Sequence, residues 1–300
     1  MKQPSVQPQG PSCILVATDL SCRCDRALDR AVQAARRRDA RLVVLTVLDP
    51  LSAAARERRS YAPSWWQLPN LRAVTERRLR DDLPSDVRAS VRVEEGPVVE
   101  SILAVAAAEG CGLIVTGIAR DETFGRLVLG TTVDALVRRA TVPVLVVRAR
   151  PRAPYHRVTV ATDFSAPSRS ALETALGLFP DGKISVFHAF DAPYVGMSGG
   201  DRSAALPAHR ASAAERCEAF LDGADLPPEA RGRLRVVLEY GPPGRVLLEY
   251  VADSEGDLIV LGAHGRPPLL DLFLGSVAKQ VLDEADTDVL VVRERPVTDA

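Results

Sequence analysis

The chain carries one sequence pattern twice, and this internal repeat restricts its fold more than any other feature. The segment Cys13-Ile-Leu-Val-Ala-Thr-Asp-Leu-Ser21 returns as Arg157-Val-Thr-Val-Ala-Thr-Asp-Phe-Ser165, which places Thr18 and Thr162 144 residues apart. Three later blocks return at an offset of 145: 113–117 as 258–262, 129–131 as 274–276, and 144–148 as 289–293. One register that holds over most of each half indicates a duplicated domain.

The length agrees with two domains. At 300 residues the chain is about twice as long as a usual domain, and 46% of it is hydrophobic, which is enough for a core in each half. A proline-bearing stretch over 149–154 separates the two copies. We expect a disordered tail over residues 1–12, a first domain over 13–150 and a second domain over 155–296.

Short β-branched runs alternate with longer stretches of helical spacing in each repeat. The runs predict strands at 14–17, 42–47, 91–94, 113–116 and 144–147, and again at 157–161, 184–190, 234–239, 258–261 and 289–292. Strands that are apolar on both faces and separated by helices favour a parallel sheet covered on both sides. Right-handed crossovers then leave a doubly wound α/β fold, with five strands in each of two tandem sheets. The long connections 50–84 and 191–228 are each expected to contain one more helix.

Composition and charge exclude several classes of function. No run approaches the roughly 18 apolar residues that span a bilayer, and the first 12 residues lack an apolar signal-peptide core. We therefore expect a cytoplasmic protein that neither enters a membrane nor is secreted. The odd, scattered set of cysteines fits neither a disulfide framework nor a zinc site and favours reduced thiols. These residues are Cys13, Cys22, Cys24, Cys111 and Cys217.

The net charge of −1 is the sum of two unequal halves. Residues 1–150 hold 23 Lys and Arg against 17 Asp and Glu, a net of +6, and residues 151–300 hold 15 against 22, a net of −7. The basic residues of the first half are interleaved with acids along helical stretches, which is typical of solvated helix faces. A nucleic-acid-binding surface needs a strongly basic face, so no nucleic-acid partner is expected.

Two groups of residues in the second half lie where an open α/β sheet binds its ligands, beyond the carboxyl ends of strands. Asp163 follows the first strand, and Gly262 and Gly265 follow the fourth. Glycines permit positive φ and remove Cβ atoms, so main-chain N–H groups can approach an anion. Gly275 and Ser276 then begin a helix, whose unpaired N–H groups favour negative charge. The pattern predicts a phosphate site.

The side chains around this candidate site leave several alternatives open. Asp163 either accepts from a ribose hydroxyl, or assists a phosphate-bound metal ion such as Mg²⁺, or only caps the following helix, for which Ser165 is placed as N-cap. His264 and Arg266 either contact a phosphate or are exposed to solvent. No nucleophile is paired with His264, so a hydrolytic triad is not expected.

With these motifs the chain resembles a tandem member of the universal stress protein family. The resemblance comprises two such domains and covers nearly all of residues 13–295. The ATP-binding members of the family share Gly-x2-Gly-x9-Gly-Ser/Thr, which Gly262, Gly265, Gly275 and Ser276 match, and Ala-Thr-Asp-Phe-Ser at 161–165 is also typical of it. The resemblance implies a Rossmann-like, adenine nucleotide alpha hydrolase-like fold. It further implies that main-chain groups at Ala189 hold adenine. The expected binding residues are Ala161, Asp163, Ala189, Gly262, His264, Gly265, Arg266, Gly275, Ser276 and Val277, with neither catalytic residues nor a metal site.

The first half departs from this motif. Arg120 stands where the second half has Gly265, and Asp121-Glu122 adds two negative charges nearby. A bulky side chain occupies the space of a triphosphate, so we expect a degenerate site; the alternative is that Arg120 itself clamps a phosphate. The residues of this site are Asp19, Val47, Gly117, Arg120, Gly130 and Thr131, and the pocket around them need not be filled.

The expected function is that of a stress-response regulatory protein that binds ATP or a related adenine nucleotide in its second domain. One alternative is an interaction module without nucleotide, and another is a slow ATPase or phosphotransferase, although the chain lacks a P-loop Gly-x4-Gly-Lys-Ser/Thr. In the family, two domains pair through the last strand of each domain, which lies at the edge of its sheet. We expect 144–147 and 289–292 to pair within one chain as a pseudo-dimer, with a homodimer left open.

Two cysteines begin the first helix of the first domain. The helix dipole there lowers the pKa of a thiol, which would make Cys22 or Cys24 a redox sensor. The alternative is that both are unreactive surface or partly buried thiols.

Overall fold

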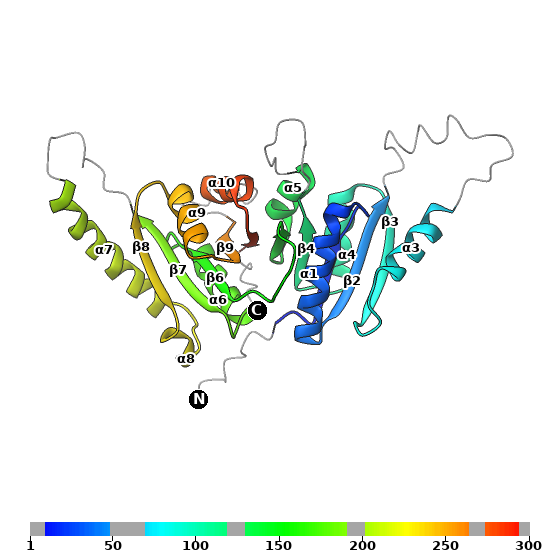
Figure 1. Ribbon diagram of the computed structural model, residues 1–300, viewed down its shortest axis with the longest axis horizontal. Helices are drawn as coiled ribbons and strands as arrows, with labels where there is room; N and C mark the ends of the chain where they lie inside the picture. Colours follow the sequence, from blue (N-terminus) through cyan, green and yellow to red (C-terminus); the bar gives the residue numbers. More distant parts are fainter. Residues whose placement is uncertain (1–9, 49–69, 119–129, 191–201, 264–273, 294–300) are drawn as a thin grey trace, which may run out of the picture. The chain divides into compact units, whose positions relative to one another are not determined.

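The computed structural model describes residues 10–48, 70–118, 130–190, 202–263 and 274–293 (Figure 1). They form two compact units, each described below by itself. Domain 1 comprises Gly10–Leu136 and Val144–Pro154, and domain 2 comprises Tyr155 onward together with Val137–Pro143. Most of the predicted tail lies outside the described residues.

Domain 1 is a five-stranded parallel sheet with the strand order β3-β2-β1-β4-β5. Its strands are β1 (Cys13–Ala17), β2 (Arg41–Leu48), β3 (Ala89–Glu95), β4 (Leu113–Gly117) and β5 (Val144–Val147). The helices that follow strands are α1 (Cys22–Arg38), α3 (Leu71–Asp81), α4 (Val98–Ala108) and α5 (Thr131–Arg139). The chain winds outward from β1 to β3 and then returns to β4 beside β1, so right-handed crossovers place helices on both faces.

Domain 2 repeats this arrangement with the order β8-β7-β6-β9-β10. Its strands are β6 (Arg157–Ala161), β7 (Lys183–Phe190), β8 (Arg235–Tyr240), β9 (Leu258–Gly262) and β10 (Asp288–Val292). Its helices are α6 (Ala166–Leu178), α7 (Arg202–Asp222), α8 (Pro228–Arg231), α9 (Pro243–Asp253) and α10 (Ser276–Glu284). In both sheets the order in which strands are added reverses beside the first strand, and a crevice is expected at this point.

The predicted fold is confirmed. Every strand predicted from the sequence is present, with its ends shifted by two residues at most, and the two long connections contain helices α3 and α7. The central strands explain why the prediction succeeds: all residues of β1 and of β4 are buried, because helices cover both faces of the sheet. Among the described residues, no helix is both long enough and apolar enough to cross a membrane.

Candidate functional site

The loop between β6 and α6 is a tight turn fixed by its own side chains. The hydroxyl of Thr162 accepts a hydrogen bond from the N–H of Phe164 at 2.9 Å, and Oδ1 of Asp163 accepts one from the N–H of Ser165 at 3.0 Å. Phe164 has a φ of 65°, a strained value for a side chain of this size. Its ring is buried 4.1 Å from the ring of His188, and this packing offsets the strain. Asp163 is therefore held in place at the end of β6.

Domain 1 contains the same turn. The N–H of Leu20 donates to the hydroxyl of Thr18 at 3.0 Å, and the N–H of Ser21 donates to Oδ1 of Asp19 at 2.9 Å. Leu20 has a φ of 62°, close to that of its counterpart Phe164. The repeated Thr-Asp-x-Ser sequence thus encodes one local structure in both domains. The predicted N-cap role of Ser165 is confirmed, since its hydroxyl accepts from the N–H of Ser168.

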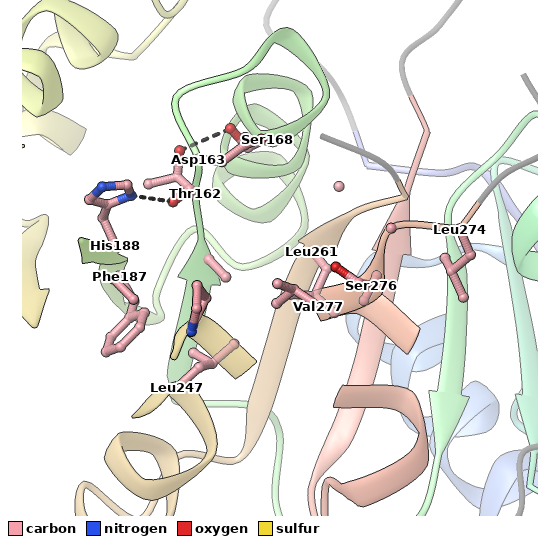
Figure 2. A pocket seen from close by; sticks show the side chains of 16 residues that line it. Thr162, Asp163, Ser168, Phe187, His188, Leu247, Leu261, Leu274, Ser276 and Val277 are labelled. Atoms are coloured by element: carbon pink, nitrogen blue, oxygen red, sulfur yellow. Dashed lines mark hydrogen bonds between the residues drawn. The ribbon is translucent and has the colours of Figure 1, made fainter. Parts of the chain in front are cut away.

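A pocket of about 410 Å³ lies beyond the carboxyl ends of β6, β7 and β9 (Figure 2). Its volume is within the range of small-molecule sites. Every predicted site residue that the structure describes lines it, namely Ala161, Asp163, Ala189, Gly262, Gly275, Ser276 and Val277. The predicted residues His264, Gly265 and Arg266 lie outside the described residues.

The pocket also contains residues that the sequence did not single out. Figure 2 shows one of them, Leu261, beside the predicted Ser276 and Val277. Two others, Thr162 and Ser168, lie with the predicted Asp163 around the start of α6. The rest of the lining is mainly apolar and comprises Phe187, His188, Pro243, Leu247, Leu261, Leu274 and Ala278. Two signals were available for the missed residues: Thr162 belongs to the repeated turn, and Leu247 lies on the buried side of α9. The pocket thus has apolar walls with polar groups at its ends.

Of the two properties of glycine considered from the sequence, Gly262 depends on the missing Cβ and not on positive φ. The glycines with positive φ in the described residues are Gly96, Gly110 and Gly241. A Cβ at Gly262 would lie 2.9 Å from the main-chain carbon of Pro167 and 3.1 Å from its oxygen. The missing side chain therefore allows α6 to begin directly against the end of β9.

Helix α10 begins at the pocket. Gly275 is its N-cap with a φ of −59°, and the N–H of Gly275 donates to the carbonyl oxygen of Ala263 at 2.9 Å. Ser276 and Val277 are the first residues of the helix, and their main-chain N–H groups have no acceptor within a regular helix. The structure thus places a helix N-terminus where the sequence predicted one, and such an end favours an anion.

The side chain of His188 forms a hydrogen bond with the loop between β6 and α6. Its Nδ1 lies 2.8 Å from the carbonyl oxygen of Thr162, so this nitrogen carries the hydrogen and donates. Burial lowers the pKa of His188, and Arg216 lowers it further, while the bond to Thr162 and the carboxylate of Asp163 oppose the shift. The imidazole is accordingly neutral at pH 7. In domain 1 the hydroxyl of Thr46 makes the equivalent bond, to the carbonyl oxygen of Thr18 at 2.7 Å.

Because domain 2 uses His188 where domain 1 uses Thr46, we expect the stability of domain 2 to fall at acidic pH. The folded state binds the proton of His188 more weakly than the unfolded state, so neutral His188 stabilises the fold above the unfolded pKa of about 6.5, and this contribution is lost as the pH falls below it. His188→Thr copies the donor of domain 1, which does not titrate. Calorimetric unfolding between pH 7.5 and 5 is expected to show a smaller fall in Tm for the variant. Equal pH slopes in both proteins would contradict this.

A second pocket, of about 290 Å³, occupies the equivalent place in domain 1. It is lined by the predicted residues Asp19, Val47, Gly117, Gly130 and Thr131, together with Thr18 and Val133 among others. Val133 stands where domain 2 has the smaller Ala278, in keeping with the smaller volume. Arg120 lies outside the described residues, so the expected degeneracy of this site stays a prediction.

Of the two alternatives for Cys24, the structure favours the unreactive thiol. Burial raises the pKa of this thiol to about 11, and the nearby Asp19 carboxylate further disfavours the thiolate through its charge. A helix dipole is too weak to overcome both effects. Cys24 lines the pocket of domain 1 as a protonated thiol. The side chain of Cys22 lies outside the described residues.

The fold and the pockets define a class: two tandem parallel α/β domains, each with a pocket where its strand order reverses. The model of the universal stress protein family matches residues 13–148 and again residues 154–293. The chain therefore belongs to the universal stress protein family, as a tandem two-domain member.

Full-length relatives agree with this assignment. A universal stress protein of Mycolicibacterium smegmatis is 26% identical over an alignment of 315 positions, which covers 94% of this chain and 97% of that protein. Universal stress protein Rv2005c of Mycobacterium tuberculosis is 27% identical over an alignment of 303 positions, which covers 96% of this chain and 99% of that protein.

Solved structures support the fold. The protein PA1789 of Pseudomonas aeruginosa PAO1 aligns with a TM-score of 0.66 at 20% identity, covering 95% of this chain and 93% of that one. A universal stress protein of Archaeoglobus fulgidus aligns with a TM-score of 0.63 at 18% identity, covering 95% and 98%.

Proposed function

We propose that domain 2 binds ATP or a related adenine nucleotide and that the protein acts as a nucleotide-dependent regulator in a stress response. The observation that carries this proposal is the pocket of domain 2. It brings together the ends of three strands and the start of α10, and with them every described member of the Gly-x2-Gly-x9-Gly-Ser motif.

The two ends of the pocket suit the two ends of a nucleotide. Ala189, near the carboxyl end of β7, offers main-chain groups for the edge of adenine, and Phe187 and Leu247 supply apolar surface for its ring. At the other end, Ser276 and the first N–H groups of α10 offer donors to phosphate oxygens. Asp163 lies at the end of β6, where we assign it to a ribose hydroxyl.

The role of Asp163 follows from its two oxygens. Oδ1 accepts from the N–H of Ser165 and also contacts the hydroxyl of Ser165, which fixes the orientation of the carboxylate. We assign Oδ2 to the ligand. In this arrangement the two functions that the sequence left as alternatives, capping the turn and contacting the ribose, belong to different atoms of one side chain.

Isothermal titration with ATP, AMP and cyclic AMP, with and without Mg²⁺, tests the proposal on the full chain. Saturable binding of at least one of them, with a Tm that rises with ligand concentration, is the expected result. Release of ADP measured in the same samples identifies slow hydrolysis if it occurs. Absence of binding by all three nucleotides would overturn the proposal and favour an interaction module.

The repeated turn supplies a matched pair of variants. Asp163→Ala is expected to weaken nucleotide binding by about 10- to 100-fold, because a hydrogen bond to a charged group is worth about 1.5–3 kcal/mol. Asp19→Ala removes the same turn contact from domain 1, since Asp19 accepts from Ser21 as Asp163 accepts from Ser165. Titration should give an unchanged Kd for this control. Equal losses in the two variants would place the ligand elsewhere.

The remaining expectations stay predictions. They are the degenerate site of domain 1, the pairing of the closing edge strands within one chain, a homodimer, and a cytoplasmic location. Sedimentation of the full chain with and without ATP measures the oligomeric state directly.

A further inference from the structure

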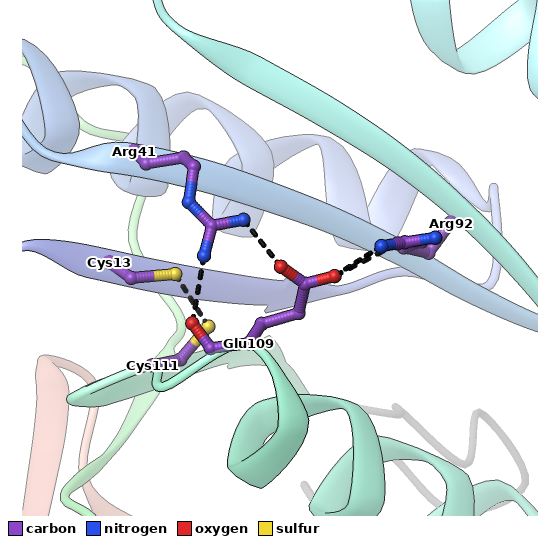
Figure 3. Close-up of polar contacts among 5 residues, drawn as sticks. All are labelled: Cys13, Arg41, Arg92, Glu109 and Cys111. Atoms are coloured by element: carbon purple, nitrogen blue, oxygen red, sulfur yellow. Dashed lines mark hydrogen bonds and ion pairs between the residues drawn. The ribbon is translucent and has the colours of Figure 1, made fainter.

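Two thiols of domain 1 meet at the amino-terminal edge of its sheet (Figure 3). Sγ of Cys13 lies 2.7 Å from Sγ of Cys111, although the residues are 98 positions apart in the sequence. This separation is only about 0.7 Å longer than a disulfide bond. Both side chains are buried, and both cysteines are reduced in the structure.

The backbone holds the two cysteines in this position. Cys13 begins β1, and the N–H of Gly112 donates to the carbonyl oxygen of Cys13 at 2.9 Å. The register continues with Ile14 opposite Leu113. Cys111 is thus one residue away from the position opposite Cys13, and the two sulfurs already lie 2.7 Å apart. A bond between the sulfurs therefore needs no large movement of either strand.

Charged side chains surround the pair. Arg41 donates to the carboxylate of Glu109 at 2.5 Å and to the main-chain oxygen of Glu109 at 2.8 Å, and Arg92 binds the same carboxylate. Burial raises the pKa of Cys111, and the neighbouring thiol and Glu109 act in the same direction, whereas the positive charge of Arg41 opposes the shift. The side chain of Arg41 is 41% exposed, so the cluster is close to solvent.

We propose that Cys13 and Cys111 are a redox modification site, which hydrogen peroxide converts into an intradomain disulfide. One thiolate attacks peroxide and becomes a sulfenic acid, with release of one water after protonation. The second thiol attacks this sulfur, the S–S bond forms, and a second water leaves. Two thiols are thus oxidised by two electrons in total, and one peroxide is reduced to two waters. Burial keeps Cys111 mostly protonated, so the attacking thiolate is a minor species and the reaction is slow; the positive charge of Arg41 favours this species.

This site is independent of the proposed nucleotide site. Cys13 begins β1 and Cys111 precedes β4, so the pair lies at the amino-terminal edge of domain 1, whereas nucleotide binding is assigned to the carboxyl ends of strands in domain 2. Closing a loop of 98 residues restricts the unfolded chain, and the Tm of domain 1 is expected to rise by about 5–10 °C on oxidation. Nucleotide affinity should not change.

Peptide mapping of the full chain tests the proposal. The protein is treated with hydrogen peroxide, its remaining thiols are alkylated, and the digest is analysed by mass spectrometry without reduction. The expected product is a peptide that links Cys13 to Cys111 and that dithiothreitol separates. The proposal is overturned if both cysteines stay open to alkylation after unfolding, or if peroxide yields only sulfinic acids or links to other cysteines.

Three variants complete the test. Cys111→Ala should abolish both the linked peptide and the rise in Tm, whereas Cys217→Ala removes another buried thiol and should leave both unchanged. Arg41→Gln should slow the reaction severalfold, a change that a purely structural arginine would not cause. If a variant fails to fold, the map of the unsubstituted protein alone decides the outcome.

Discussion

Gly262→Ala is expected to destabilise domain 2 by about 1–3 kcal/mol, the usual result of overpacking a tight site. The new Cβ would lie 2.9 Å from the main-chain carbon of Pro167, closer than real Cβ contacts. Since the obstructing atoms belong to the backbone at the start of α6, no side-chain rotation relieves the clash. Either α6 or the end of β9 must move, and both line the pocket.

Gly232→Ala is the matched control for this substitution. Gly232 has a φ of −68°, and nothing lies within 4 Å of a Cβ added there, so alanine should be neutral or stabilise by about 0.5 kcal/mol. Urea unfolding measures both variants, and hydrogen exchange of the peptides from β9 and α6 assigns the loss to this contact. Equal stabilities of the two variants would show that α6 does not depend on the missing side chain.

Gly265→Arg is expected to abolish nucleotide binding while the fold stays intact. It copies the departure of the first repeat, where Arg120 stands at the corresponding position. A side chain there takes the space assigned to the phosphates and displaces at least two charge-assisted hydrogen bonds of about 1.5–3 kcal/mol each. Together these losses weaken binding by more than about 100-fold.

Titration with ATP and circular dichroism separate the two effects in Gly265→Arg. Unchanged spectra and an unchanged Tm without ligand, with no ligand-dependent rise in Tm, are the expected result. The reverse substitution, Arg120→Gly, distinguishes the two alternatives for domain 1. New binding would identify Arg120 as an obstruction, and a loss of existing binding would identify it as a phosphate clamp. Retained affinity in Gly265→Arg would refute the degenerate-site argument.

The fold could be predicted because its signals are local or repeated. The apolar runs mark every strand, the Thr-Asp-x-Ser sequence marks the turn after the first strand of each domain, and the repeat fixes the register between the halves. The described residues of the predicted site also meet in one pocket. They follow the ends of parallel strands, and such ends always lie at the same edge of a sheet.

The features that escaped prediction depend on contacts between distant segments. Spacing along the sequence gave no sign that Cys13 and Cys111 touch, because strand order alone brings them together. The hydrogen bond from His188 to Thr162 and the close approach of Gly262 to Pro167 also join segments that are distant in the sequence. For Cys24 the sequence left a reactive and an unreactive thiol as alternatives, because it indicates the helix dipole but not the extent of burial, and burial is the larger effect.

The position-by-position match of the two pockets has a consequence for gene dosage. One polypeptide holds both, so every molecule carries one pocket lined by Ala278 and one lined by Val133 in a fixed 1:1 stoichiometry. Two separately encoded single-domain proteins would reach that ratio only through balanced expression. Fusion of the copies makes the proportion of the two kinds of pocket independent of transcription.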